Sequence, residues 1–328
     1  MNRRDWLSRT SLPVFAVLGE LLRLRRANAL APATSSASSW PGFGQAKSVI
    51  VVFANGGQSQ LESWDPKPDA PAEVRGAFGA IPTSVPGTII SDRLPKLAKL
   101  ADRYSIIRTM SHEDLDHGSA FYLAMTGTYH QRLSSNPPAR PTDHPFFGSV
   151  LKRVRPTQKF VHTSVMVNGP AQVPFEIGPG QFGGLLGKDF DPMIVGDVTT
   201  GRPPVPGLTP IATLDGHRRS GRAELLSHLE TSAAQAGTEF SSPMFDMQAM
   251  YRQAFDMLDR PEAREAFNLN AESAALRDRY GRHRSGQACL LARRLVEAGT
   301  PLVTVMWNHS NRGQDRFEDE EEFGWDTH

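Results

Sequence analysis

The chain has 328 residues, of which 22% are charged and 39% are hydrophobic. This composition is typical of a globular protein and excludes a wholly disordered chain. The formal net charge is +1, but the first 29 residues contribute six arginines and only two acidic residues. Without them, 30 basic residues stand against 33 acidic ones, and no long basic stretch remains. The sequence therefore gives no indication of a nucleic-acid partner.

The N-terminus has the order of an export signal. Paired arginines at Arg3 and Arg4 precede a short apolar run, and small residues follow at 27–29. The pair resembles a twin-arginine signal, so we expect residues 1–29 to be a signal peptide and the protein to be periplasmic or secreted. An amphipathic N-terminal helix is the alternative. Glu20 interrupts the apolar run, which is too short for a stable membrane span.

Residues 30–46 are rich in Pro, Ser, Ala and Gly and are expected to form a linker. A domain over 47–328 then opens with the β-branched run 48–53, which is typical of a strand buried on both faces of a parallel sheet. Further strands are expected at 105–110, 160–168 and 301–307, and irregular loops over 168–210. The segments 94–104, 119–127, 144–154, 222–235, 244–258 and 275–299 are expected to be helical. This alternation predicts an α/β fold with helices on both faces of the sheet.

Polar clusters follow three of the expected strands, where ligands of such sheets bind. The first is 55–68: Gly56 and Gly57 allow close backbone approach, and Ser59 can cap a helix whose N–H groups attract an anion. In the same cluster Asn55, Glu62 and Asp65 are candidate metal ligands. The alternative is a glycine turn, a serine cap and first-turn acids with no function.

The second cluster, 112–127, holds two histidines and three acids within six residues just before a helix, a pattern that suits a cation or a bound phosphate or sulfate. Solvated helix-start residues are the alternative. The third cluster ends the chain: Asp326 and His328 are two apart and, in an extended segment, point to the same side as two ligands of one metal. Such a pair also arises by chance.

Several long motifs together resemble one family of exported bacterial proteins, the domain of unknown function 1501. They are the twin-arginine start and the segments 56–78, 94–127, 141–150, 276–299 and 324–328. The family is grouped with the alkaline-phosphatase and sulfatase superfamily. The resemblance implies a three-layer α/β/α sandwich, alkaline-phosphatase-like, with metal ions at the strand ends and a nucleophile at a helix start.

The chain departs from that pattern at three places. The spacing to Thr126 puts His117 at the nucleophile's position, with Ser119 two residues later, and a neutral Asn55 stands where a metal-binding carboxylate is usual. His117 is therefore a candidate nucleophile, metal ligand or general acid. The family continues beyond its Asp-Thr-His motif, so we expect the chain to be truncated at the C-terminus and to hold the N-terminal two-thirds of the domain.

The resemblance predicts an exported hydrolase of phosphate or sulfate esters that uses a divalent metal (zinc, manganese, magnesium or calcium). Its substrate is a small-molecule or glycan ester. His117 and Ser119 are the candidate catalytic residues; Gly56, Gly57 and Ser59 are the candidate anion-binding residues. The candidate metal ligands are Asn55, Glu62, Asp65, Asp326 and His328. The alternatives are a non-catalytic member that binds an anionic glycan or a cell-envelope partner, and an inactive truncated fragment.

Overall fold

The computed structural model describes residues 41–157, 162–173, 176–201, 216–235 and 261–307. The chain divides into two units, Met1–Lys47 and Ser48–His328, and every element below belongs to the second. The predicted signal peptide, the helix expected at 244–258, and Asp326 and His328 lie outside the described residues.

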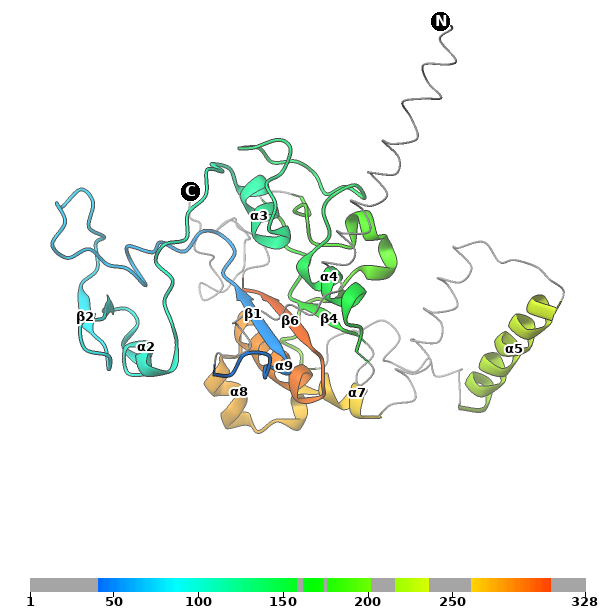
Figure 1. The fold of residues 1–328 in the computed structure, drawn as a ribbon. Coiled ribbons are helices and arrows are strands. Elements are labelled where there is room, and N and C mark those ends of the chain that lie inside the picture. The colour runs from blue at the N-terminus through cyan, green and yellow to red at the C-terminus, as the bar shows by residue number, and fades with distance from the viewer. Residues whose placement is uncertain (1–40, 158–161, 174–175, 202–215, 236–260, 308–328) are drawn as a thin grey trace, which may run out of the picture. The chain divides into compact units, whose positions relative to one another are not determined.

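A parallel four-stranded sheet forms the centre of the second unit (Figure 1). Its strands are β1 (Val49–Phe53), β4 (Ser164–Val167), β5 (Met193–Val195) and β6 (Leu302–Met306), in the order β1-β6-β4-β5. The strand nearest the N-terminus therefore pairs with the last one along the described chain. A second, antiparallel pair is formed by β2 (Ala80–Pro82) and β3 (Ile89–Ser91).

Seven α-helices and four 3-10 turns are described besides the strands. The α-helices are α2 (Pro95–Ala98), α3 (His117–Thr126), α4 (Phe147–Val154), α5 (Gly216–Gln235), α7 (Pro261–Ala266), α8 (Ala274–Tyr280) and α9 (Arg284–Glu297). The 3-10 turns are η2 (Ala101–Arg103), η3 (Gly184–Leu186), η4 (Lys188–Phe190) and η5 (Leu269–Ala271). None of the helices in the described ranges is long and apolar enough to cross a membrane.

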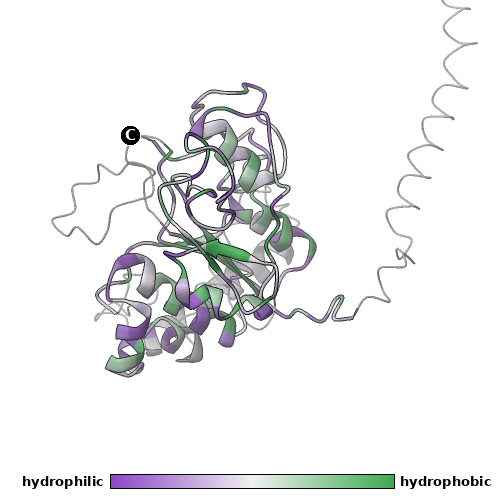
Figure 2. Ribbon diagram, turned by 90° about the vertical axis from the view of Figure 1, so that its left-hand side faces the viewer, coloured by the Kyte–Doolittle hydropathy of each residue, from purple (hydrophilic) through white to green (hydrophobic). Residues whose placement is uncertain are grey.

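Side chains of β4 and β6 alternate between two buried clusters, one on each face of the sheet. On one face Val165 and Val303 pack with α9, where Leu291 and Leu295 are fully buried. On the other, Met166 and Met306 pack in a cluster that also contains Phe121 of α3 and Phe146 at the start of α4. Figure 2 shows the strands as hydrophobic segments. The predicted α/β class, with helices on both faces, is therefore confirmed.

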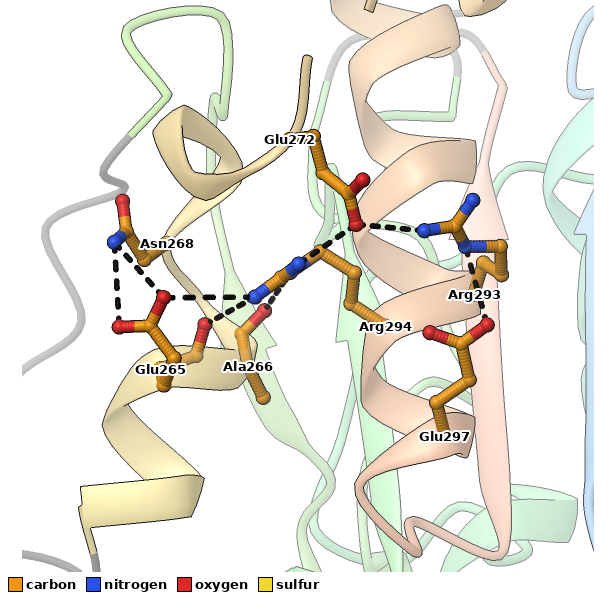
Figure 3. A network of polar contacts seen from close by, with 7 residues as sticks. All are labelled: Glu265, Ala266, Asn268, Glu272, Arg293, Arg294 and Glu297. Atoms are coloured by element: carbon orange, nitrogen blue, oxygen red, sulfur yellow. Dashed lines mark hydrogen bonds and ion pairs between the residues drawn. The ribbon is translucent and has the colours of Figure 1, made fainter. Parts of the chain in front are cut away.

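An ion-pair and hydrogen-bond network connects α9 with α7 and with the residue after the turn η5 (Figure 3). Arg294 donates to the Glu272 carboxylate at 2.7 Å and to the carbonyl oxygens of Glu265 and Ala266 at 2.6 and 3.0 Å. Arg293 donates to the same carboxylate at 2.6 Å. The hydrogen bond from Arg294, supported by the charges of both arginines against the opposing effect of burial, holds the pKa of Glu272 below its usual range. This network links the end of α7 and the turn η5 to the helix that covers the sheet.

Several predicted elements agree with the structure. The strands expected at 48–53, 160–168 and 301–307 are β1, β4 and β6, and helix α3 ends at Gly127 as expected, with φ of 72°. Helix α9 lies within the segment expected to be helical over 275–299, and its Ala292 and Leu295 are fully buried in the core.

Other predictions were wrong. Residues 105–110 form no strand: Ile107 and Met110 are exposed at the surface, and Arg108 bonds to distant carbonyl groups instead. The helix expected over 94–104 is broken into α2 and η2, and that over 275–299 is interrupted at Gly281. The strand β5 and the β2–β3 pair were not predicted.

Strand β1 also differs from the expectation of burial on both faces. It pairs with β6 alone in the described part of the sheet, so it lies at an edge. Val49, Ile50 and Val52 are 50%, 40% and 49% exposed. An edge strand has a neighbour on one side only, which is the reason for this exposure.

Candidate functional site

Polar residues follow three neighbouring strands at the carboxyl edge of the sheet. Asn55 comes two residues after β1, Asn168 comes directly after β4 and Trp307 directly after β6. The backbone N–H of Trp307 donates to the carbonyl of Phe53 at 2.9 Å, and both asparagines are buried. Ligands of parallel sheets bind at this edge, so these residues define the candidate site.

Asn168 is the most constrained residue of this edge. It has a left-handed backbone, with φ of 66°, and its side chain is fully buried. Its Nδ2 donates to the carbonyl oxygen of Met306 at 3.0 Å, and its Oδ1 accepts a short hydrogen bond from Nε of Arg284. Non-glycine residues in this conformation cluster at functional sites.

Helix α9 begins at the same edge, because it runs antiparallel to β6, which follows it. His283 is its N-cap, its imidazole Nδ1 accepting from Gly286 N–H at 3.3 Å, and the Ser285 hydroxyl donates to the carbonyl of Trp307. Asn168, Arg284 and Ser285 were not among the predicted site residues. The order of the elements could have indicated Arg284 and Ser285. When a tight turn joins a helix to the next parallel strand, the start of the helix lies beside the carboxyl end of that strand.

Helix α3 reaches the edge through an aromatic contact. The rings of Phe53 in β1 and Phe121 in α3 pack edge to face, with centroids 5.4 Å apart. The helix begins at His117, which is half-buried, and its N-cap is Asp116, whose Oδ1 accepts from the His117 N–H at 2.8 Å. The candidate catalytic residues are therefore carried by the helix that packs beside β1.

A loop over 134–136 closes the start of α3. The Gly118 N–H donates to Oδ1 of Asn136 at 2.8 Å, and the Ser119 N–H donates to the carbonyl of Ser135 at 3.0 Å. The Asn136 amide also donates to Asp116 at 2.6 Å. The first-turn N–H groups that attract an anion at a helix start thus already have acceptors within the protein.

Ser119 is fully buried under this loop. Its hydroxyl donates to Oδ1 of Asp114 at 2.5 Å and accepts from the Ser135 N–H at 3.1 Å. Asp114 Oδ1 also accepts from the N–H groups of Ser134 at 3.0 Å and Asp116 at 3.3 Å. An ester reaches the Ser119 oxygen only after the loop moves, whereas His117 is half-exposed.

The candidate anion-binding residues lie in a turn after β1. Gly56 and Gly57 have φ of 98° and 74°, conformations that favour glycine. Ser59 caps no helix: residues 61–64 form turns, and the carbonyl oxygen of Ser59 accepts from the Ser63 hydroxyl at 2.5 Å. The expected anion site at a helix start is therefore absent from 55–65, and the glycine turn is the part of that prediction that agrees.

The candidate metal ligands of the described part point to other partners. Asp65 pairs with Lys67 at 2.6 Å and with Arg108 at 3.3 Å, so both of its carboxylate oxygens face cations. One oxygen of Glu62 accepts from the Ala77 N–H at 3.4 Å. Within the described ranges no three His, Cys, Asp or Glu side chains are grouped as a metal site. The carboxylates of Glu62 and Asp65 are therefore turned to these partners, and metal binding by Asn55, Glu62 and Asp65 stays a prediction.

Comparison with known proteins identifies a family. The family described as a protein of unknown function (DUF1501) matches residues 46–328. No curated protein and no solved structure matches the chain significantly. The family match covers most of the chain and all described elements of the α/β unit, so the chain belongs to the DUF1501 family.

Proposed function

We propose that this protein is an exported hydrolase of phosphate or sulfate esters with an alkaline-phosphatase-like α/β/α sandwich. The parallel sheet with helices on both faces supports the architecture, and polar residues at the carboxyl ends of β1, β4 and β6 support a ligand site there. The observation that carries the proposal is the start of α3, where half-exposed His117 precedes by two residues a buried serine that is bonded to a carboxylate.

The proposed chemistry uses groups of α3 and its preceding loop. When Ser135 and Asn136 withdraw, the N–H groups of Gly118 and Ser119 become available to an ester oxygen. The Ser119 hydroxyl then attacks phosphorus or sulfur while its proton passes to Asp114. The ester bond breaks, and the leaving oxygen takes a proton from His117. Water then attacks the phosphorus or sulfur held on Ser119 and gives its proton to His117. The bond to Ser119 breaks, and the serine oxygen takes its proton back from Asp114.

The proposal includes a divalent metal, held by Asp326 and His328 together with residues of 55–65. The side chains of Glu62 and Asp65 are turned to other partners, so Asp326 and His328 would be the main metal ligands. Metal analysis of the folded full chain tests it. Zinc, manganese, magnesium or calcium at stoichiometric level supports the metal, and its absence after reconstitution contradicts it.

An ester panel tests the reaction. Nitrophenyl phosphate, bis-nitrophenyl phosphate and nitrophenyl sulfate are compared on wild type, His117→Ala and Ser119→Ala, with exposed Ser111→Ala as a matched control. Turnover that both site variants lose and the control keeps supports the proposal. Equal rates in all four proteins, or no turnover in any, contradict it.

A second candidate is a non-catalytic protein that binds an anionic glycan or a cell-envelope partner. Two observations favour it: Ser119 is fully buried, and a neutral Asn55 follows β1. Binding of a glycan without turnover on the ester panel distinguishes this candidate from the hydrolase.

Export through the twin-arginine route is tested separately. Cell fractionation of wild type and of a variant with Arg3→Lys and Arg4→Lys is expected to find only the wild type in the periplasm or medium. Retention of both proteins in the cytoplasm would overturn the export proposal without bearing on the chemistry.

A further inference from the structure

A cavity of about 280 Å³ opens beside strand β2. Two stretches of chain, 66–68 and 75–80, form its walls. The charged residues among its described lining are Lys67 and Arg75, and none of that lining is acidic. The volume is just below that of sites for drug-sized ligands, so it suits a group the size of one sugar ring.

Two carboxylates outside the lining accept hydrogen bonds from the backbone of the wall 75–80. The Ala77 N–H donates to Glu62 at 3.4 Å, and the Gly79 N–H donates to Asp92 at 3.2 Å. A Cβ atom on Gly76 would lie 2.8 Å from the Glu62 side chain. Because Gly76 has no Cβ atom, Glu62 can approach the backbone this closely. The carboxylates of Glu62 and Asp92 are both engaged in hydrogen bonds with the wall.

The charged side chains that line the cavity are two cations, Lys67 and Arg75. Lys67 lies 2.6 Å from Asp65, but the same carboxylate also pairs with Arg108 at 3.3 Å, so one negative charge serves two cations. Arg75 is exposed, and its side chain has no hydrogen bond or ion pair within the described part of the chain. An anionic group would complete the pairing of both Lys67 and Arg75.

An aromatic ring supplies an apolar surface next to these cations. Phe78 lines the cavity and is 41% exposed. The guanidinium carbon of Arg93, which lies outside the lining and pairs with Asp92 at 3.6 Å, is 4.3 Å from the ring centroid. Pro66 and Pro68 also line the cavity, so its lining combines apolar side chains, which suit a ring, with the cations Lys67 and Arg75, which suit an acid.

We propose that this cavity binds an acidic sugar. Its carboxylate or sulfate group lies between Lys67 and Arg75, and its ring packs against Phe78. The carboxylates Glu62 and Asp65 support the cavity: one holds its wall and the other orients Lys67. This inference concerns binding and requires no ester hydrolysis, so it stands or falls independently of the proposed reaction.

Calorimetric titration of the full chain tests the inference with three probes: a sulfated heparin disaccharide, trigalacturonate and neutral maltotriose. Binding is expected for one or both acidic probes and not for maltotriose. The first identifies a sulfated ligand, the second a carboxylated one. Affinity is expected to fall as salt is added, because Lys67 and Arg75 are exposed charges.

Matched variants locate the binding. Arg75→Gln is expected to weaken binding about tenfold, which corresponds to the loss of one charge-assisted hydrogen bond. Lys99→Gln removes an exposed cation elsewhere and is expected to leave the affinity unchanged. Circular dichroism checks that both variants are folded. Equal weakening by the two variants, equal binding of maltotriose, or no binding of either acidic probe would overturn the inference.

Discussion

The Ser119 hydroxyl donates to Oδ1 of Asp114 at 2.5 Å, and both side chains lie beneath the loop that closes helix α3. Ser119→Ala removes this donor and leaves the buried carboxylate with one partner fewer. We expect the free energy of unfolding to fall by about 1–3 kcal/mol, measured by urea denaturation. Exposed Ser111→Ala is the control and should change it by less than about 0.5 kcal/mol. Equal unfolding midpoints for the two variants would contradict a structural role for the pair.

Asn136 acts as a cap for a helix that begins well before it in the chain. Its Oδ1 accepts from the Gly118 N–H, so Asn136→Ala is expected to destabilise the protein by about 0.5–2 kcal/mol. The exposed N–H group should then attract an anion. We expect sulfate, compared with chloride at equal ionic strength, to raise the Tm of this variant more than that of wild type. An equal rise in both proteins would argue against an anion site beneath the loop.

The left-handed backbone of Asn168 allows a two-variant test. Asn168→Ala loses two side-chain hydrogen bonds and puts alanine in an unfavourable conformation, so it should destabilise by about 2–4 kcal/mol. Asn168→Gly loses the same bonds but adopts a positive φ readily, so it should be about 1 kcal/mol less destabilising. Chemical denaturation measures both. A glycine variant less stable than the alanine variant would show that the backbone conformation is not the cause.

The lowered pKa of Glu272 predicts how the stability of the folded protein depends on pH. Its pKa is lowered in the folded protein, mainly by the hydrogen bond from Arg294. Such a group stabilises the fold fully above its unfolded pKa, and the contribution is lost as the pH falls through the folded pKa. The stability difference between wild type and Glu272→Gln should therefore be largest near neutral pH and vanish in acid. A difference that grows on acidification would contradict this pairing.

Cys289 provides a chemical probe of unfolding. Burial raises the pKa of its thiol to about 11, so at pH 8 the folded protein holds almost no reactive thiolate. Reaction with a disulfide reagent at pH 8 should be slow in buffer and fast in denaturing urea. The shift also implies that stability decreases as the pH rises from the unfolded thiol's pKa towards 11, because the unfolded thiol ionises first. Immediate labelling without urea would disprove its protection.

The sequence predicted the elements that depend on local pattern. The apolar runs that became β1, β4 and β6 contain β-branched residues flanked by turns, and Gly127 ends α3 because glycine accepts a left-handed φ. Segment 105–110 has a similar β-branched pair, yet Arg108 there bonds to the carbonyls of Trp64 and Ile89. Contacts that span 44 and 19 residues leave no local pattern to detect.

The candidate site was predictable only in part for the same reason. The family resemblance pointed to His117 and Ser119 through the spacing to Thr126, but the loop over 134–136 that covers Ser119 leaves no local sequence pattern. Asp65 matched a metal ligand by type, while its actual partners are set by the approach of Arg108 from a distant turn. Residue type indicated which chemistry was available, and tertiary contacts determined where each group points.

The edge position of β1 affects how this protein can be handled in solution. In the described part of the sheet one side of the strand has no neighbour, and its valines and isoleucine are half-exposed. Such a row of backbone donors and acceptors beside apolar side chains is a template on which a strand from another chain can pair. Ile50→Lys should therefore slow the growth of light scattering in concentrated samples. The variant would extend the range of protein concentration over which binding and turnover can be measured.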